Sequence, residues 1–273
     1  MRHRIICITA AQRSGTTALQ RALASSGEVE NCGEIFQDDP ASRAGIADMS
    51  FSAFARLYDI RLTEVMKSTG ALDTATRYTQ WLASKAAPKR PLIDVKLNAW
   101  LALAPAWKYP QEEPLFLRHL KRERTAFICI WREDLAEQIL SMFISQKLGI
   151  WHNIDAEKVA GRRFDAPITR LKRTAGLLCR SELDMHEYLR SYPDKIIVRY
   201  EDMFADGGLS ENFASALEAL TGVKSPRGRS AIRPNSVSKR DIIANYEEAA
   251  AAIRKIAIRY RTRELDEHTF AAR

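Results

Sequence analysis

Cysteine, histidine and long apolar runs are all scarce in this sequence, and each scarcity excludes a class of protein. The 273 residues include four cysteines and five histidines. The cysteines lie far apart without a Cys-x-x-Cys pair, and the histidines lack ligand spacing, so neither a disulfide framework nor a zinc site is indicated. We therefore predict no metal, and free thiols favour a cytoplasmic protein.

The hydropathy pattern of the sequence also indicates no membrane span and no targeting segment. No apolar run approaches the roughly 18 residues of a transmembrane helix. The apolar stretch near the N-terminus covers only about six residues before a turn, so we interpret it as a first strand and not as a signal peptide. The length suits one large α/β domain or two small ones. We predict a single domain over residues 1–273.

Positive charge is in excess. The formal net charge is +8 and the isoelectric point is about 9.4. Such a balance favours anionic partners, among them nucleotides, nucleic acid, anionic lipid and acidic glycans, without choosing between them. A Pro-, Ser- and Arg-rich stretch at 224–238, KSPRGRSAIRPNSVS, is interpreted as part of a basic flap over a site at 224–240, with a linker as the alternative.

The order of elements predicts the fold class. Four apolar runs rich in β-branched residues read as buried strands: 4–9, 92–97, 126–131 and 195–200. Helical patterns lie between and after them: 15–26, 49–68, 74–86, 134–149, 168–192, 210–222 and 245–260. Alternating strands and helices predict an α/β fold in which helices flank a central parallel sheet on both faces.

One of these helices carries its own end signals. Asp134 stands at the expected N-cap, Glu137 follows three residues later, and Gly149 stands at the expected end. This is the pattern of a capping box.

The segment AAQRSGTT runs from the first strand into the first helix, which is the layout of a phosphate-binding loop. Free backbone N–H groups and the helix dipole favour an anion there. The loop has no Gly-Lys-Ser/Thr ending, and Arg13 precedes the glycine instead. The guanidinium of an arginine suits a phosphate or sulfate oxygen. The predicted anion-binding residues are Arg13, Ser14, Gly15, Thr16 and Thr17.

These residues resemble the 5′-phosphosulfate loop of sulfotransferases that use 3′-phosphoadenosine 5′-phosphosulfate (PAPS). The second motif of that superfamily, an arginine after a later strand and a serine eight or nine residues on, is matched by Arg132 and Ser141 in WREDLAEQILS. Ser141 would lie about 10 Å along the helix that begins at Asp134, within reach of one 3′-phosphate shared with Arg132. NCGEIFQ at 31–37 and SMFISQKLGIWH at 141–152 resemble the bacterial trehalose 2-sulfotransferase-like family.

The resemblance also implies catalytic roles. Arg13 and Lys96 would stabilise charge on the leaving oxygen, and no metal would be needed. Asn98 stands where the cytosolic enzymes have a histidine base, so Glu34 is the better candidate for the general base.

The remaining candidates lie later in the chain. Trp151 and His152 would line the acceptor pocket, and Lys239 and Arg240 would close over the nucleotide phosphates.

We therefore predict a PAPS-dependent sulfotransferase of cytoplasmic, bacterial type that acts on a hydroxyl of a carbohydrate or glycolipid and releases 3′-phosphoadenosine 5′-phosphate (PAP). We expect no nucleic-acid partner and no membrane span. Peripheral membrane contact and a homodimer stay open. The alternatives are a P-loop kinase acting on a small molecule, and a non-catalytic binder of anionic lipid or nucleic acid.

Overall fold

A computed structural model describes residues 4–37, 48–104, 112–150, 159, 161–224 and 238–261. Over this part of the chain, a five-stranded parallel sheet forms the centre of the molecule, with strand order β2-β3-β1-β4-β5. The strands are β1 (Ile6–Ala10), β2 (Val29–Glu34), β3 (Arg90–Lys96), β4 (Ala126–Trp131) and β5 (Lys195–Arg199). The predicted α/β class and parallel sheet are confirmed.

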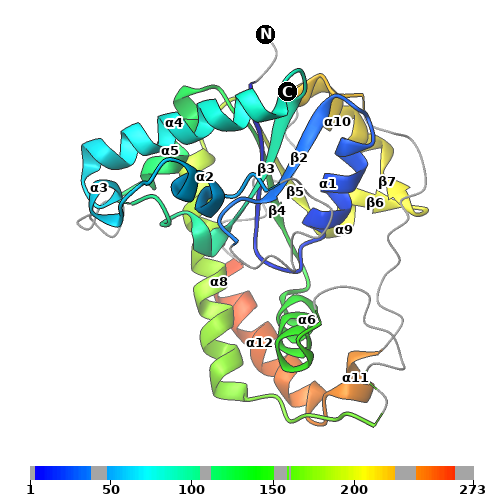
Figure 1. Ribbon diagram of the computed structural model, residues 1–273. Coiled ribbons are helices and arrows are strands. Elements are labelled where there is room, and N and C mark those ends of the chain that lie inside the picture. Colours follow the sequence, from blue (N-terminus) through cyan, green and yellow to red (C-terminus); the bar gives the residue numbers. More distant parts are fainter. Residues whose placement is uncertain are drawn as a thin grey trace.

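Helices and short strands surround the sheet (Figure 1), and some of the helices follow the predicted ranges closely. They are α1 (Thr16–Ala24), α2 (Phe51–Leu57), α3 (Leu62–Val65), α4 (Ser68–Ala86), η2 (Leu97–Ala99), α5 (Leu115–Arg122), α6 (Leu135–Leu148), α8 (Ile168–Leu189), α9 (Tyr200–Met203), β6 (Phe204–Ala205), β7 (Gly208–Leu209), α10 (Glu211–Thr221), α11 (Lys239–Ile242) and α12 (Tyr246–Arg261). The single helix predicted over 49–68 is wrong, because this stretch forms the two short helices α2 and α3.

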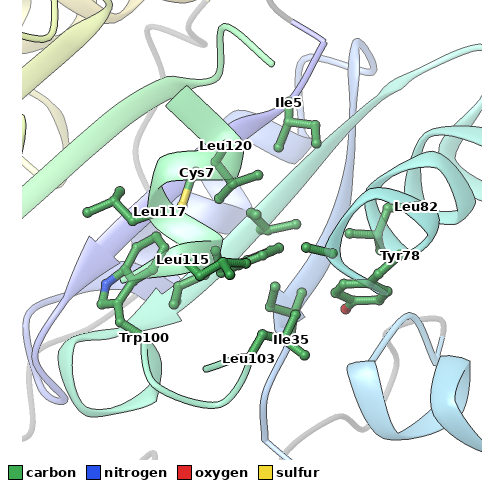
Figure 2. Close-up of a cluster of buried hydrophobic side chains, with 14 of the residues drawn as sticks. Ile5, Cys7, Ile35, Tyr78, Leu82, Trp100, Leu103, Leu115, Leu117 and Leu120 are labelled. Carbon is green, nitrogen blue, oxygen red and sulfur yellow. The ribbon is translucent and has the colours of Figure 1, made fainter. Parts of the chain in front are cut away.

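Each face of the sheet has its own apolar core. On one face, Ile6 and Ile8 of β1 pack with Leu19 of α1 and Phe213 of α10. On the other face, Cys7 packs in a cluster that includes residues of α4, α5 and α8. Figure 2 shows part of this second cluster, with Tyr78 and Leu82 on one side and Leu115, Leu117 and Leu120 on the other. Helices therefore cover both faces, as predicted.

A third apolar cluster lies away from the sheet. It joins α6, α8, α11 and α12, which Figure 1 shows below the sheet. Its buried members include Leu140 of α6, Leu171 of α8 and Ile253 of α12. This cluster fixes α6, the helix that follows β4, and so places the residues that α6 presents to the sheet.

The edge strand β2 was not predicted, and neither was the small antiparallel pair β6–β7. The sequence of β2, VENCGE, is half polar and has only some of its side chains buried. Such a composition suits a strand at the edge of a sheet but lacks the apolar run that identifies a central one.

No helix in the described part of the chain combines the length and the apolar character that crossing a membrane requires. Whether residues 1–273 form a single domain stays a prediction.

Candidate active site

The predicted loop lies between the end of β1 at Ala10 and the start of α1 at Thr16. Two of its residues adopt left-handed backbone conformations, Arg13 with φ 66° and Gly15 with φ 74°. A Cβ atom on Gly15 would lie 2.6 Å from the ring of Tyr200, so this position needs glycine for space as well as for its φ. A left-handed arginine is strained, and such strain concentrates at functional sites.

Helix α6 holds this loop from the side. The Gln138 amide Nε2 donates hydrogen bonds to the Gln12 carbonyl (2.9 Å) and to Ser14 Oγ (2.8 Å). Ser14 and Gln138 are both buried. Gln138 was not among the predicted site residues, although it stands three residues before Ser141 and thus on the same side of the helix.

The structure brings Arg13, Arg132 and Ser141 together. The Arg13 side-chain Nε donates to Ser141 Oγ (3.0 Å), and Arg132 Nη1 donates to the Arg13 carbonyl (3.3 Å). Burial and the nearby charge of Arg132 lower the pKa of Arg13. Two arginines that repel each other in a partly buried place are well suited to share an anion.

Arg132 is itself held on two sides. Its guanidinium lies 4.6 Å from the centre of the Tyr200 ring, and its Nε lies 3.7 Å from Glu201 Oε1. Arg261, at the end of α12, donates to the Arg132 carbonyl (2.6 Å) and pairs with the buried Glu182 (2.5 Å). None of these supporting residues was predicted to belong to the site.

A second group of charges surrounds Lys96 at the end of β3. Its Nζ donates to Thr16 Oγ1 (2.6 Å) and Asp94 Oδ2 (2.7 Å) and lies 3.3 Å from Glu34 Oε1. Burial opposes the charge of Lys96, but Asp94 and Glu34 outweigh it and hold the pKa of Lys96 above its usual value. The predicted residues Glu34, Lys96 and Thr16 therefore form one cluster, and Asp94 is an addition to it.

All these residues lie at one edge of the sheet. In a parallel sheet the carboxyl ends of the strands share an edge, and ligands bind there where the chain switches direction across the sheet. Here β3 and β4 pair with opposite sides of β1, and Ala10 of β1 is in register with both Lys96 and Ile130. The loop after β1 thus lies at the switch point, between Lys96 on one side and Arg132 on the other.

The two predicted flap residues have carboxylate partners. Lys239 Nζ pairs with Glu137 Oε2 (2.5 Å), and Arg240 pairs with Glu247. Glu137 also accepts from the Tyr246 hydroxyl (2.6 Å), so its side chain faces α11 and α12. Closure of Lys239 and Arg240 over a nucleotide stays a prediction, and residues 225–237 of the proposed flap lie outside the described residues.

The other predicted residues are accounted for as follows. Thr17 is half-buried on α1, and Asn98 is exposed in η2 directly after β3. Trp151 and His152 lie outside the described residues. Within the residues that the structure describes, no three or more His, Cys, Asp or Glu side chains are grouped so as to hold a metal ion. The absence of a metal therefore stays a prediction.

No family model matches the chain, and no curated protein matches it. Among solved structures, the chain is similar to a sulfotransferase domain from the curacin biosynthetic pathway. The two are 14% identical, the match covers 99% of this chain and 95% of that chain, and the TM-score is 0.39. A similarity at this identity and TM-score assigns neither an activity nor a substrate to this chain.

Proposed function

We propose that this protein is a sulfotransferase that moves a sulfuryl group from PAPS to a hydroxyl of a carbohydrate or glycolipid and releases PAP. The observation that carries the proposal is the meeting of Arg13, Arg132 and Ser141 beside the left-handed loop at the end of β1. These residues come from two motifs more than a hundred positions apart, and both motifs resemble those of PAPS-dependent enzymes.

The site offers two separate groups of N–H and O–H donors, which suits a donor with two separate anionic ends. Arg132 and Ser141 would bind the 3′-phosphate. Arg13, the loop N–H groups, Thr16, Thr17 and Lys96 would bind the 5′-phosphosulfate, since free amides at the start of a helix favour an anion. Lys96 is already hydrogen-bonded to Thr16 in the first turn of α1.

The transfer needs a base and a stabilised leaving group. The acceptor hydroxyl loses its proton to Glu34 while its oxygen forms a bond to sulfur. The bond between sulfur and the bridging phosphate oxygen breaks, and PAP leaves with the electron pair. Positioning and charge stabilisation do most of the work in such displacements. Arg13 and Lys96 stabilise the departing charge, and Trp151 and His152 contact the acceptor.

A P-loop kinase is the second candidate, because the strand, loop and helix follow one another here as they do in those enzymes. The two functions differ in the nucleotide that they need. A kinase needs ATP with magnesium, whereas the proposed enzyme needs a nucleotide with a 3′-phosphate.

The first test compares nucleotides by thermal unfolding. PAP at about a hundredfold excess over its Kd should raise the free energy of unfolding by about 2.7 kcal/mol. ATP with magnesium and adenosine 5′-phosphosulfate should do much less, because neither has a 3′-phosphate. Equal stabilisation by ATP would favour the kinase.

A variant sharpens this test. R132A should weaken PAP binding by roughly 1.5–3 kcal/mol, the range for a charge-assisted hydrogen bond, and leave adenosine 5′-phosphosulfate binding nearly unchanged. The matched control is R4A, which removes an arginine that is 80% exposed at the opposite edge of the sheet. Equal losses for both nucleotides would mean that Arg132 supports the fold and does not bind the 3′-phosphate.

A further inference from the structure

The ammonium group of Lys96 has every one of its donors occupied. A lysine ammonium carries three N–H donors and no acceptor. Three oxygens surround it: Thr16 Oγ1 at 2.6 Å, Asp94 Oδ2 at 2.7 Å and Glu34 Oε1 at 3.3 Å. An anionic ligand that is to reach Lys96 must therefore replace one of these partners.

The two carboxylates around Lys96 are held very differently. Asp94 is 1% exposed, and Gln20 of α1 donates a hydrogen bond to the same Oδ2 atom (2.7 Å). The side chain of Glu34 is 38% exposed, and its contact with Lys96 is the longest of the three. Asp94 is thus the fixed partner and Glu34 the exchangeable one.

Burying the carboxylate of Asp94 costs free energy, so we expect another interaction to compensate it. Its second oxygen, Oδ1, is buried without a hydrogen-bond partner in the described structure. A buried carboxylate survives when a nearby cation compensates it. Because Asp94 and Lys96 are two residues apart on β3, both side chains point to the same face of the sheet. This face is the one that Thr16 and Gln20 of α1 cover.

The groups that face Lys96 come from every neighbouring element. They are Asp94 on β3 itself, Glu34 at the end of β2, and the uncharged Thr16 and Gln20 on α1. Cys7 of β1 points to the other face of the sheet, where burial together with the charge of Asp94 raises the pKa of that thiol well above its usual value. Within this set, Asp94 is the one fully buried negative charge.

We propose that Asp94, fixed by Gln20, is a positioning residue that keeps Lys96 protonated and directed at Thr16, so that an anionic donor meets a cation already in place and displaces only Glu34. For the identity of the donor, the inference rests on the proposed function. The protonation and direction of Lys96, by contrast, do not depend on which donor binds.

The test is the pH dependence of PAP binding in the variant D94N, which keeps the shape of Asp94 and removes its charge. A buried lysine without a fixed counter-ion loses its proton at a lower pH. Between about pH 7.5 and about pH 9.5, the PAP affinity of D94N should fall on the order of tenfold or more, while that of the wild type changes little. A D94N profile as flat as the wild-type profile would overturn the proposal.

The matched control makes the same acid-to-amide change at the other carboxylate of the cluster. E34Q should keep a flat binding profile, because Asp94 remains beside Lys96. A pH dependence of equal size in E34Q would show that the two carboxylates share the role, which contradicts the assignment to Asp94.

A measurement on the wild type needs no nucleotide. The side-chain resonances of Lys96 can be followed by NMR against pH, with K96M to assign them. The midpoint should lie above the usual lysine value of about 10.4. A midpoint below that value would overturn this inference even if PAP binds. Failure of the wild type to bind PAP, with Lys96 titrating as expected, would instead overturn the proposed function alone.

Discussion

At the scale of a single residue, the proposed general base Glu34 gives the most direct test of the chemistry. Glu34 lies at the end of β2, 3.3 Å from Lys96, with part of its side chain open to solvent. We predict that E34Q lowers kcat by about 10²–10⁴, the span for the loss of a general base, and leaves PAP affinity intact. The measurement is sulfated product formed from PAPS on a carbohydrate acceptor that the wild type accepts.

E30Q is the control, since Glu30 lies on the same strand and pairs with the surface residue Lys89. It should keep the wild-type rate. A near-normal rate in E34Q would move the role of base to another group, with His152 as the next candidate. Loss of PAP binding in E34Q would show instead that Glu34 supports the structure of the site.

Helix α6 is the element on which the site depends most. Asp134 caps it by accepting a hydrogen bond from the Glu137 backbone N–H (3.0 Å), and Gly149 ends it in a left-handed conformation. The predicted N-cap and end are confirmed. The Glu137 side chain does not complete a capping box, because its carboxylate binds Lys239 and Tyr246.

The cap of α6 supplies a prediction about stability. D134A should reduce the free energy of unfolding by about 1 kcal/mol, because a donor at the first turn loses its partner. Denaturant unfolding measures this change. D134N should cost little, since asparagine caps a helix about as well as aspartate. A loss in D134N as large as in D134A would mean that the ion pair between Asp134 and Arg254 carries the effect.

At the scale of the whole molecule, the cores enclose all four thiols. Cys7, Cys32, Cys129 and Cys179 are buried, and none of them forms a disulfide. Burial raises the pKa of Cys129 to about 12 and that of Cys179 to about 11. The reactive form of cysteine is the thiolate, so these thiols should be inert while the protein is folded.

Labelling with Ellman's reagent at about pH 8 checks this expectation. The native protein should release almost no product during the time in which free glutathione reacts fully. The same sample in guanidinium chloride should release product from all four cysteines. Fast reaction of any thiol in the native protein would show that one core opens readily.

The sequence by itself was sufficient for the central elements. The four buried strands were predicted because short apolar runs rich in β-branched residues, separated by helical patterns, indicate buried strands. The loop with Arg13 was predicted from its strand-loop-helix pattern. Arg132 and Ser141 were predicted from their resemblance to a motif that is local in the sequence, and their role stays a prediction. The edge strand β2 was missed, since a half-buried strand with glycine and polar residues has no such run.

Only the tertiary structure could assign the residues that support the site. Asp94 meets Gln20 across 74 positions of sequence, and Gln138 meets Ser14 across 124. These contacts exist because β3 and β4 pair with opposite sides of β1, so that Asp94 of β3 meets α1 and the helix after β4, α6, meets the loop. Local patterns indicate which residues form a strand or a helix. They do not indicate which strands become neighbours, because strand order depends on burying the apolar faces of the whole chain at once.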